Sequence, residues 1–295
     1  MNAPAYFLPL GPVDDGDSAG PGGMAASGGE FLRFMPTEHT HGAWGPFQHG
    51  SPPAALLTRM LERCSGIPEG TRTTRIAVDL LGAVPYTELR ARSWISRPGR
   101  QILKVEAELL AEVRGSWRPV ASASAWRMAV AETSGIERAF ERPIPGPDQA
   151  GPDGVPLIDA WGGGYIDSVE AVAAADPDPL PGAGGQAPPV HWVRTRLPVV
   201  DGEEPSPVER LMQVVDTANG IGATLDPSEW AFMNTDLVVH LHRVPEFTGD
   251  WWLGIAARGS IGPDGIGMTA GELYDARGPI GRSVQTLLVR PQDQP

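Results

Sequence analysis

The chain has 295 residues with 23 basic and 36 acidic side chains, which gives a formal net charge of −13 at pH 7. Its single cysteine, Cys64, excludes an internal disulfide and therefore a disulfide-stapled secreted domain. The acidic excess argues against a general nucleic-acid binder, because neutralising a phosphate backbone needs a clustered Lys/Arg surface. Hydrophobic residues make up 41% of the chain, enough for a substantial core, and the length favours two domains or one duplicated domain.

Three segments rich in glycine and proline divide the chain. Residues 11–30 predict a flexible loop, residues 136–160 predict a linker, and residues 176–189 form a third break. We therefore expect an N-terminal domain over residues 1–135 and a C-terminal domain over residues 161–295. The N-terminus has no signal-peptide pattern, and no apolar run approaches the ~18 residues of a membrane span. We expect a soluble, cytoplasmic protein that binds neither membrane nor nucleic acid.

The first domain reads as one helix followed by four strands. Ser51-Pro52-Pro53 is typical of a helix start, an apolar stripe of helical period runs from Leu56 to Cys64, and Gly66 can end the helix. Segments rich in valine and isoleucine then predict strands over residues 75–85, 88–96, 102–113 and 119–129.

The second domain repeats this order. Ser206-Pro207 begins a predicted helix over residues 208–220, and strands are predicted over residues 234–245, 251–260, 267–276 and 279–290. Val84-Pro85 matches Val244-Pro245 at a spacing of 160 residues, and Pro119-Val120 matches Pro279-Ile280 at the same spacing. The repeat indicates an internal duplication, which predicts two α+β units whose sheets curl around their helices and join edge to edge.

Several catalytic motifs are missing from the sequence. It contains neither the G-x-S-x-G turn of α/β-hydrolases nor a phosphate-binding P-loop. Two H-x-H pairs, His39/His41 and His240/His242, could each present two imidazoles on one strand face, but no matching third ligand accompanies them. We expect no metal and no bound cofactor.

Three polar residues of the second half lie among apolar neighbours. Asp216 follows the apolar stripe near the end of its helix, Asn234 opens the next strand, and Gln285 interrupts the last strand. Buried amides must find hydrogen-bond partners, and a carboxylate with two amides can accept a proton from a water and orient it. The alternative for Asp216 is a local backbone cap or a solvated side chain. At that end of its own helix, the carboxylate gains nothing from the helix dipole.

The chain resembles the double-hotdog acyl-CoA thioesterases, the thioesterase II-like group of bacteria that includes actinobacterial members. The resemblance extends from about Phe34 to Arg290 and depends on four strings taken together. These are THGAWGPFQHGSPPAALLTRMLE in the first half, and EEPSPVERLMQVVDTANG, NTDLVVHLHR and GRSVQTLLVR in the second. In this family each hotdog is a central helix wrapped by an antiparallel sheet, and two hotdogs fuse into a pseudo-dimer. The resemblance therefore implies an α+β double hotdog.

The family's working trio is a helix aspartate, a threonine or asparagine at the start of the following strand, and a glutamine on the last strand. These positions fall on Asp216, Asn234 and Gln285, with Thr235 as the alternative to Asn234 because thioesterase II has threonine there. Repeat spacing places Thr74 and Ala125 at the corresponding positions of the first half, so the resemblance implies one active site.

His49-Gly50, just before the first helix, stands where single-hotdog thioesterases often carry an H-G-G motif. Backbone N–H groups at a helix start could polarise a thioester carbonyl, and His49 could contact the substrate or pack against Trp44. The implied reaction is hydrolysis of an acyl-CoA to free acid and coenzyme A by an activated water. Coenzyme A enters as part of the substrate. An acyl tunnel would be lined by aromatic residues such as Trp230, Phe232 and Trp252, for which packing in the core is the favoured alternative.

Two alternatives stay open. The first is a non-catalytic hotdog protein that binds acyl-CoA or an acyl chain. The second is a hotdog enoyl-CoA hydratase, which needs an Asp/His pair that the helix ending at Asp216 does not contain. The net charge repels coenzyme A at long range, so local arginines such as Arg97, Arg100, Arg243 or Arg258 must bind it. By analogy with other hotdog proteins, pairing of sheets would give a homo-oligomer.

Overall fold

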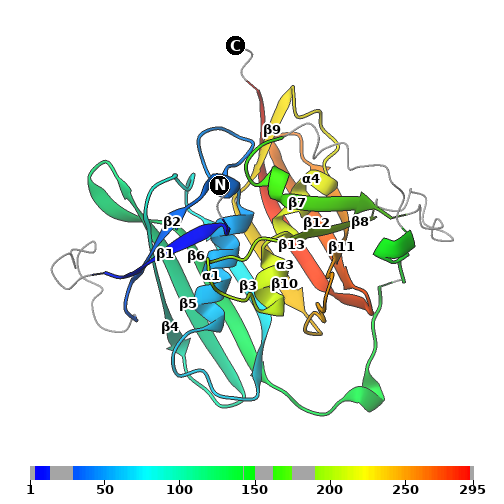
Figure 1. The fold of residues 1–295 in the computed structure, drawn as a ribbon. Coiled ribbons are helices and arrows are strands. Elements are labelled where there is room, and N and C mark those ends of the chain that lie inside the picture. Colours follow the sequence, from blue (N-terminus) through cyan, green and yellow to red (C-terminus); the bar gives the residue numbers. More distant parts are fainter. Residues whose placement is uncertain (1–3, 14–28, 142, 150–161, 175–189, 293–295) are drawn as a thin grey trace.

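A computed structural model describes residues 4–13, 29–141, 143–149, 162–174 and 190–292 (Figure 1). The elements of the first half are β1 (Phe7–Pro12), β2 (Leu32–Pro36), α1 (Ser51–Glu62), β3 (Thr71–Leu80), β4 (Leu89–Arg97), β5 (Ile102–Val113) and β6 (Ser116–Ala129). Those of the second half are β7 (Val169–Ala173), β8 (Val190–Thr195), α3 (Pro207–Met212), the 3₁₀ turn η6 (Val215–Thr217), α4 (Ala218–Ile221), β9 (Trp230–Asn234), β10 (Asp236–Leu241), β11 (Leu253–Ile261), β12 (Ile266–Asp275) and β13 (Gly278–Pro291).

In the described part of the chain, the strands form one antiparallel sheet. Its order is β1-β2-β4-β5-β6-β3-β10-β13-β12-β11-β8-β7, and β9 adds to β13. The two halves join where β3 pairs with β10, as the expected edge-to-edge arrangement requires. In that ladder Ile76 lies opposite Val239, and Asp79 lies opposite Asp236. Asp236 lies 160 positions after Ile76, and Val239 lies 160 positions after Asp79. A shift by the repeat spacing therefore turns one pair into the other, which relates the two halves.

Each half wraps its sheet around a helix, as Figure 1 shows for α1 beside β3 to β6. Proline in the first turn of α1 loses no helical hydrogen bond, since the first N–H groups of a helix have no intrahelical partner. Leu56, Leu57 and Leu61 are almost completely buried in the main core. The second helical segment, α3, contacts α1 directly, so the helices of the two halves pack side by side.

The predicted helix over residues 208–220 is wrong in one respect, because it is broken into α3, η6 and α4. Val214 leaves the helical conformation with φ −130°, and its carbonyl accepts the Thr217 hydroxyl at 2.7 Å. Next to the break, the Gln213 carbonyl accepts the Tyr165 hydroxyl at 2.7 Å. Side-chain hydrogen bonds with the backbone here compete with the regular helical bonds.

The four-strand prediction for each half is incomplete. The structure adds β1 and β2 to the first half and β7, β8 and β9 to the second. Of the predicted strand 234–245, residues 236–241 form β10, and Asn234 is the last residue of β9. Within the predicted flexible loop 11–30, Gly11 and Pro12 belong to β1. Residues 14–28, 150–160 of the predicted linker and 176–189 of the third break lie outside the described residues. The domain limits 1–135 and 161–295 stay predictions.

Candidate active site

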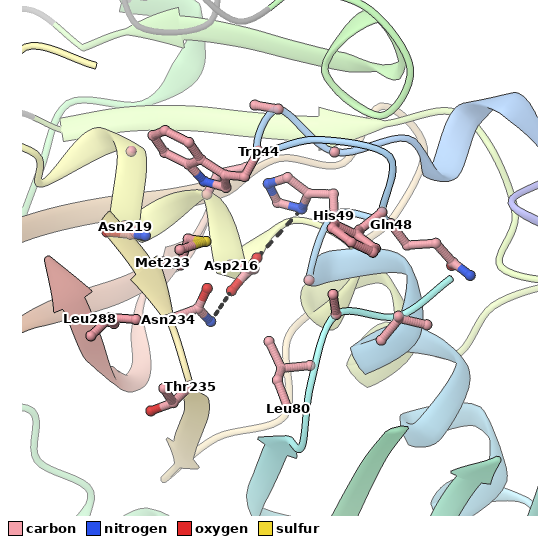
Figure 2. A pocket seen from close by; sticks show the side chains of 18 of the residues that line it. Trp44, Gln48, His49, Leu80, Asp216, Asn219, Met233, Asn234, Thr235 and Leu288 are labelled. Atoms are coloured by element: carbon pink, nitrogen blue, oxygen red, sulfur yellow. Dashed lines mark hydrogen bonds and ion pairs between the residues drawn. The ribbon is translucent and has the colours of Figure 1, made fainter. Parts of the chain in front are cut away.

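A cavity of about 490 Å³ lies where the two halves meet. The first half contributes residues 42–50 before α1 and residues 80–84 at the end of β3. The second half contributes the η6–α4 segment and the end of β9. Figure 2 shows Asp216 in the middle of these elements, with Leu80 on one side and Asn219 on the other. A site at this position needs both halves.

Asp216 is buried, with 5% of its surface exposed. Its Oδ1 accepts the Asn234 Nδ2–H group at 2.8 Å and the Gln285 Nε2–H group at 2.7 Å. The structure therefore brings together the three residues of the trio implied by the resemblance. The break after Val214 places Asp216 in η6 rather than at the end of a continuous helix.

The two amides have different access to the cavity. Asn234 lines it, whereas Gln285 is completely buried, and within the described residues its side chain hydrogen-bonds only with Asp216. Thr235 also lines the cavity, but its side chain is exposed and points away from Asp216 in Figure 2. Of the two candidates at this position, Asn234 is the one that contacts the carboxylate.

Gly50 allows the start of α1 to approach Asp216. A Cβ atom at Gly50 would lie 2.6 Å from Asp216 Oδ2, closer than any side chain tolerates. The dipole argument made for the end of a continuous helix no longer applies to Asp216, which lies in the first turn of η6 and at the amino-terminal end of α1 from the other half, where a negative charge is favoured. The sequence alone could not show this contact because 166 positions separate the two residues.

His49 contacts Asp216 from the same side, with Nδ1 at 3.4 Å from Oδ2. Nδ1 also accepts the Ser51 backbone N–H at 3.1 Å, which leaves the proton of the neutral ring on Nε2. Nε2 has no hydrogen-bond partner among the residues that the structure describes, and in Figure 2 it lies on the side of Trp44. The absence of a histidine from the Asp216 helix therefore does not exclude an Asp/His pair, because His49 comes from the other half.

The ring of His49 stacks on Tyr165 rather than on Trp44. The two ring centroids are 4.0 Å apart and the planes differ by 17°, while Trp44 makes an edge contact with Phe232. Tyr165 belongs to the segment that precedes β7, and its N–H donates to the His41 carbonyl at 2.9 Å. Tyr165 could not be predicted from the sequence, because no local pattern around it indicates a contact with a residue of the first half.

Burial determines the ionisation of the two groups. It raises the pKa of Asp216 to about 6, outweighing the hydrogen bonds from Asn234 and Gln285 that lower it. Burial also lowers the pKa of His49 to about 3, so the imidazole is neutral near pH 7. The 3.4 Å contact consequently joins a carboxylate to a neutral ring, and Asp216 can act as a base at neutral pH.

Two further expectations need correction. The cavity is lined by Trp44 and Phe47 together with aliphatic side chains, and Trp230, Phe232 and Trp252 are not among its lining residues. Arg243 makes two hydrogen bonds with the buried carboxylate of Asp275, both at 2.7 Å, so it is committed to the fold and not to a ligand phosphate.

The corresponding positions of the first half hold no trio. Ala125 is buried in β6 opposite Ile76, and the Thr74 hydroxyl donates to the Trp126 carbonyl at 3.1 Å. Within the described residues, no group of three or more histidine, cysteine or acidic side chains could hold a metal ion. No helix in this part of the chain is long and apolar enough to cross a membrane.

Solved structures with the same architecture come from several bacteria. A hot dog fold protein from Alicyclobacillus acidocaldarius has 13% identity and a TM-score of 0.67, with 90% of this chain and 95% of that chain covered. An acyl-CoA thioesterase II, TesB2, from Mycobacterium marinum has 13% identity and a TM-score of 0.61, with coverage of 89% and 94%. A tesB protein from Mycobacterium avium subs paratuberculosis has 13% identity and a TM-score of 0.60, with coverage of 88% and 93%. The double-hotdog prediction is confirmed.

Sequence comparison identifies both halves. Residues 38–128 match the model of the acyl-CoA thioesterase N-terminal domain, and residues 138–289 match that of the acyl-CoA thioesterase C-terminal domain. No curated protein matches the chain. Since the C-terminal model alone spans more than half of the sequence, the chain belongs to the acyl-CoA thioesterase family.

Proposed function

We propose that the protein hydrolyses acyl-CoA thioesters, with Asp216 as the general base. The observation that carries the proposal is the Asp216 carboxylate, which has a pKa raised to about 6 and is fixed by two amide donors at the wall of a largely apolar cavity. A base with a pKa close to neutral combines a large ionised fraction with useful basicity. The apolar walls suit an acyl chain, and the family supplies the substrate class.

The reaction needs one water and no covalent acyl-enzyme. Asp216 takes a proton from the water while the water oxygen bonds to the thioester carbon. The C–S bond then breaks, and the proton on Asp216 goes to the leaving thiolate. Asn234 Nδ2 is engaged with Asp216, so its Oδ1 is the group available to accept from the water. Gln285 acts through Asp216 as a positioning residue, because it is completely buried.

The developing oxyanion needs hydrogen-bond donors. His49 supplies a neutral imidazole with its proton on Nε2, and Gly50 supplies a main-chain N–H at the start of α1. A ring with a pKa of about 3 does not gain or lose a proton near pH 7, which makes His49 a hydrogen-bond donor rather than an acid or base. This argues against the hydratase alternative, which uses the histidine for proton transfer.

The test is release of free thiol from a panel of acyl-CoA thioesters of different chain length. We expect turnover with some member, and a loss of more than about tenfold in kcat/KM for Asp216→Asn. Asp226→Asn is the matched control, because Asp226 is exposed and its carboxylate bonds only to Ser228 among the described residues. Tight binding without thiol release would favour the non-catalytic acyl-CoA binding protein. Hydration of an enoyl-CoA without thiol release would favour the hydratase.

A further inference from the structure

Strand β9 has an open edge beside the cavity. Within the described residues it pairs only with β13, in a register that places Asn234 opposite Leu287 and Met233 opposite Leu288. The Thr235 N–H donates to the Thr286 carbonyl at 3.0 Å. Because the main-chain groups of successive residues point to opposite sides of a strand, those of Met233 face β13 and those of Phe232 and Asn234 face the open edge.

The main-chain carbonyls on either side of Asn234 along this edge already accept hydrogen bonds. The Phe232 carbonyl accepts the Asn219 side-chain amide at 3.0 Å, and the Thr235 carbonyl accepts the Leu80 N–H at 2.9 Å where β3 begins to pair with this strand. Between them, the N–H and C=O of Asn234 have no hydrogen-bond partner in the part of the chain that the structure describes. Figure 2 shows this stretch of β9 facing Leu80 across the cavity.

We propose that the main chain of Asn234 binds the amide-bearing arm of the substrate's thiol carrier, which pairs with the open edge of β9 as a short added strand. The proposal rests on thioester hydrolysis as the function. The arm of coenzyme A is an extended chain interrupted by secondary amides, so it offers the donors and acceptors that an unpaired strand edge requires. The Asn234 carbonyl accepts the N–H of the amide nearest the sulfur, and its N–H donates to an amide carbonyl.

The same residue then positions both reaction partners. The Asn234 side chain holds Asp216 at 2.8 Å, and its backbone holds the arm that ends in the thioester. The apolar cavity wall around it includes Leu80, Met233 and Leu288. A main-chain group that loses water in such surroundings without gaining a partner is costly, so a substrate lacking the amide is penalised.

Matched small thioesters test the pairing. The same acyl group is attached to N-acetylcysteamine, to 2-mercaptoethyl acetate, in which oxygen replaces the N–H, and to a simple alkanethiol of equal length. We expect kcat/KM for the oxygen analogue and the alkyl thioester to fall by about tenfold or more relative to the amide. Equal rates for the amide and its oxygen analogue, after correction for their uncatalysed hydrolysis, would overturn the proposal while leaving the thioesterase function intact.

A second measurement does not depend on turnover. A thioether analogue of an acyl-pantetheine, which carries both amides of the arm, cannot be hydrolysed, and its binding is followed through the backbone amide signals in a ¹H–¹⁵N NMR titration. We expect a downfield shift of the Asn234 amide proton with this ligand, and little change at Met233, whose N–H already faces β13. If no thioester is cleaved, the proposed function fails, but the Asn234 shift still supports binding of the arm. A bound thioether that leaves the Asn234 amide unchanged contradicts the pairing.

Discussion

The ionisation of Asp216 reflects two opposing effects on one carboxylate. Burial favours the neutral acid, while the amides of Asn234 and Gln285 both donate to Oδ1 and favour the anion. Because both donors bind the same oxygen, Oδ2 is left facing His49 and Gly50. Two hydrogen bonds therefore fix the direction in which the carboxylate presents its second oxygen, and burial raises its pKa.

The rate of thioester hydrolysis should follow the ionisation of Asp216. With a pKa of about 6, we expect kcat/KM to be constant above neutral pH and to fall about tenfold per pH unit below 6. The unfolded chain has the lower pKa for this group, so the ionised carboxylate destabilises the fold above pH 6, and this cost disappears as the pH falls below about 4.

The Asp216→Asn variant should therefore melt at a higher temperature than the wild type at pH 8. Below pH 4 the two melting temperatures should converge. Thermal denaturation across this pH range measures the difference. A variant less stable than the wild type at pH 8 would show that the buried charge is not a cost to the fold.

How much of the site the sequence predicts depends on whether each contact is local or joins the two halves. Asp216, Asn234 and Gln285 could be found because each lies in a string that resembles the family. The stack of His49 on Tyr165 could not, since it depends on the packing of a glycine-rich segment over 100 positions away. Asn234 was found for its side chain, while its unpaired backbone appears only when the register with β13 is known.

At the scale of elements, periodicity predicts where helices and strands lie better than where they break. The strand over residues 102–113 agrees residue for residue with β5, and the helix expected after Ser51 is α1. The predicted helix over residues 208–220 has an apolar stripe from Val208 to Val215, yet it breaks at Val214, and this break gives Asp216 its direction. A hydrophobic stripe reports burial, not the tertiary hydrogen bonds that compete with the helix.

The approach of α1 to η6 depends on the missing side chain of Gly50. Alanine there would put a methyl group 2.6 Å from Asp216 Oδ2, so the carboxylate or the helix start must move. Since φ is −63°, alanine itself fits the backbone conformation. We expect Gly50→Ala to lower kcat/KM by about a hundredfold, because small displacements of catalytic groups are costly.

Gly82→Ala is the control for this substitution. Gly82 also lines the cavity, but a Cβ atom there has nothing within 4 Å, so activity should change little. Comparing kcat/KM of both variants, with circular dichroism to confirm folding, isolates the contact with Asp216. If Gly50→Ala is as active as Gly82→Ala, the close approach is not needed for catalysis.

At the scale of the whole molecule, the candidate active site exists only if the two halves hold their relative position. His49 and Gly50 come from the first half, while Asp216 and Asn234 come from the second. The halves are held by the β3–β10 ladder and by ion pairs between α1 and the region around α3. Although the chain carries a net charge of −13, Arg59 and Arg63 of α1 each face an acidic side chain of the other half at this junction.

Glu203 is the centre of this junction. Its carboxylate accepts two hydrogen bonds from the Arg59 guanidinium, at 2.7 and 2.5 Å, and one from the Arg63 guanidinium at 2.6 Å. Burial tends to raise the pKa of Glu203, but Arg59 and Arg63 outweigh it and lower the pKa below the ordinary value of 4.5. Its carboxylate therefore stabilises the fold above pH 4.5, and this contribution is lost as the pH falls through the lowered pKa.

Glu203→Gln should reduce the free energy of unfolding by about 1–3 kcal/mol at pH 7, because it leaves two arginines without their charge partner. The loss of unfolding free energy should be smaller than for a fully buried ion pair, since 25% of the Glu203 side chain is exposed. Glu246→Gln is the matched control, because Glu246 pairs with Arg277 on the surface and both side chains are about half exposed or more. Urea denaturation at pH 7 and again below pH 4 measures both variants. If the charge of Glu203 does not hold the halves together, the two variants should be equally stable. A loss of unfolding free energy in Glu203→Gln that becomes smaller below pH 4 would identify the ion pairs as the cause.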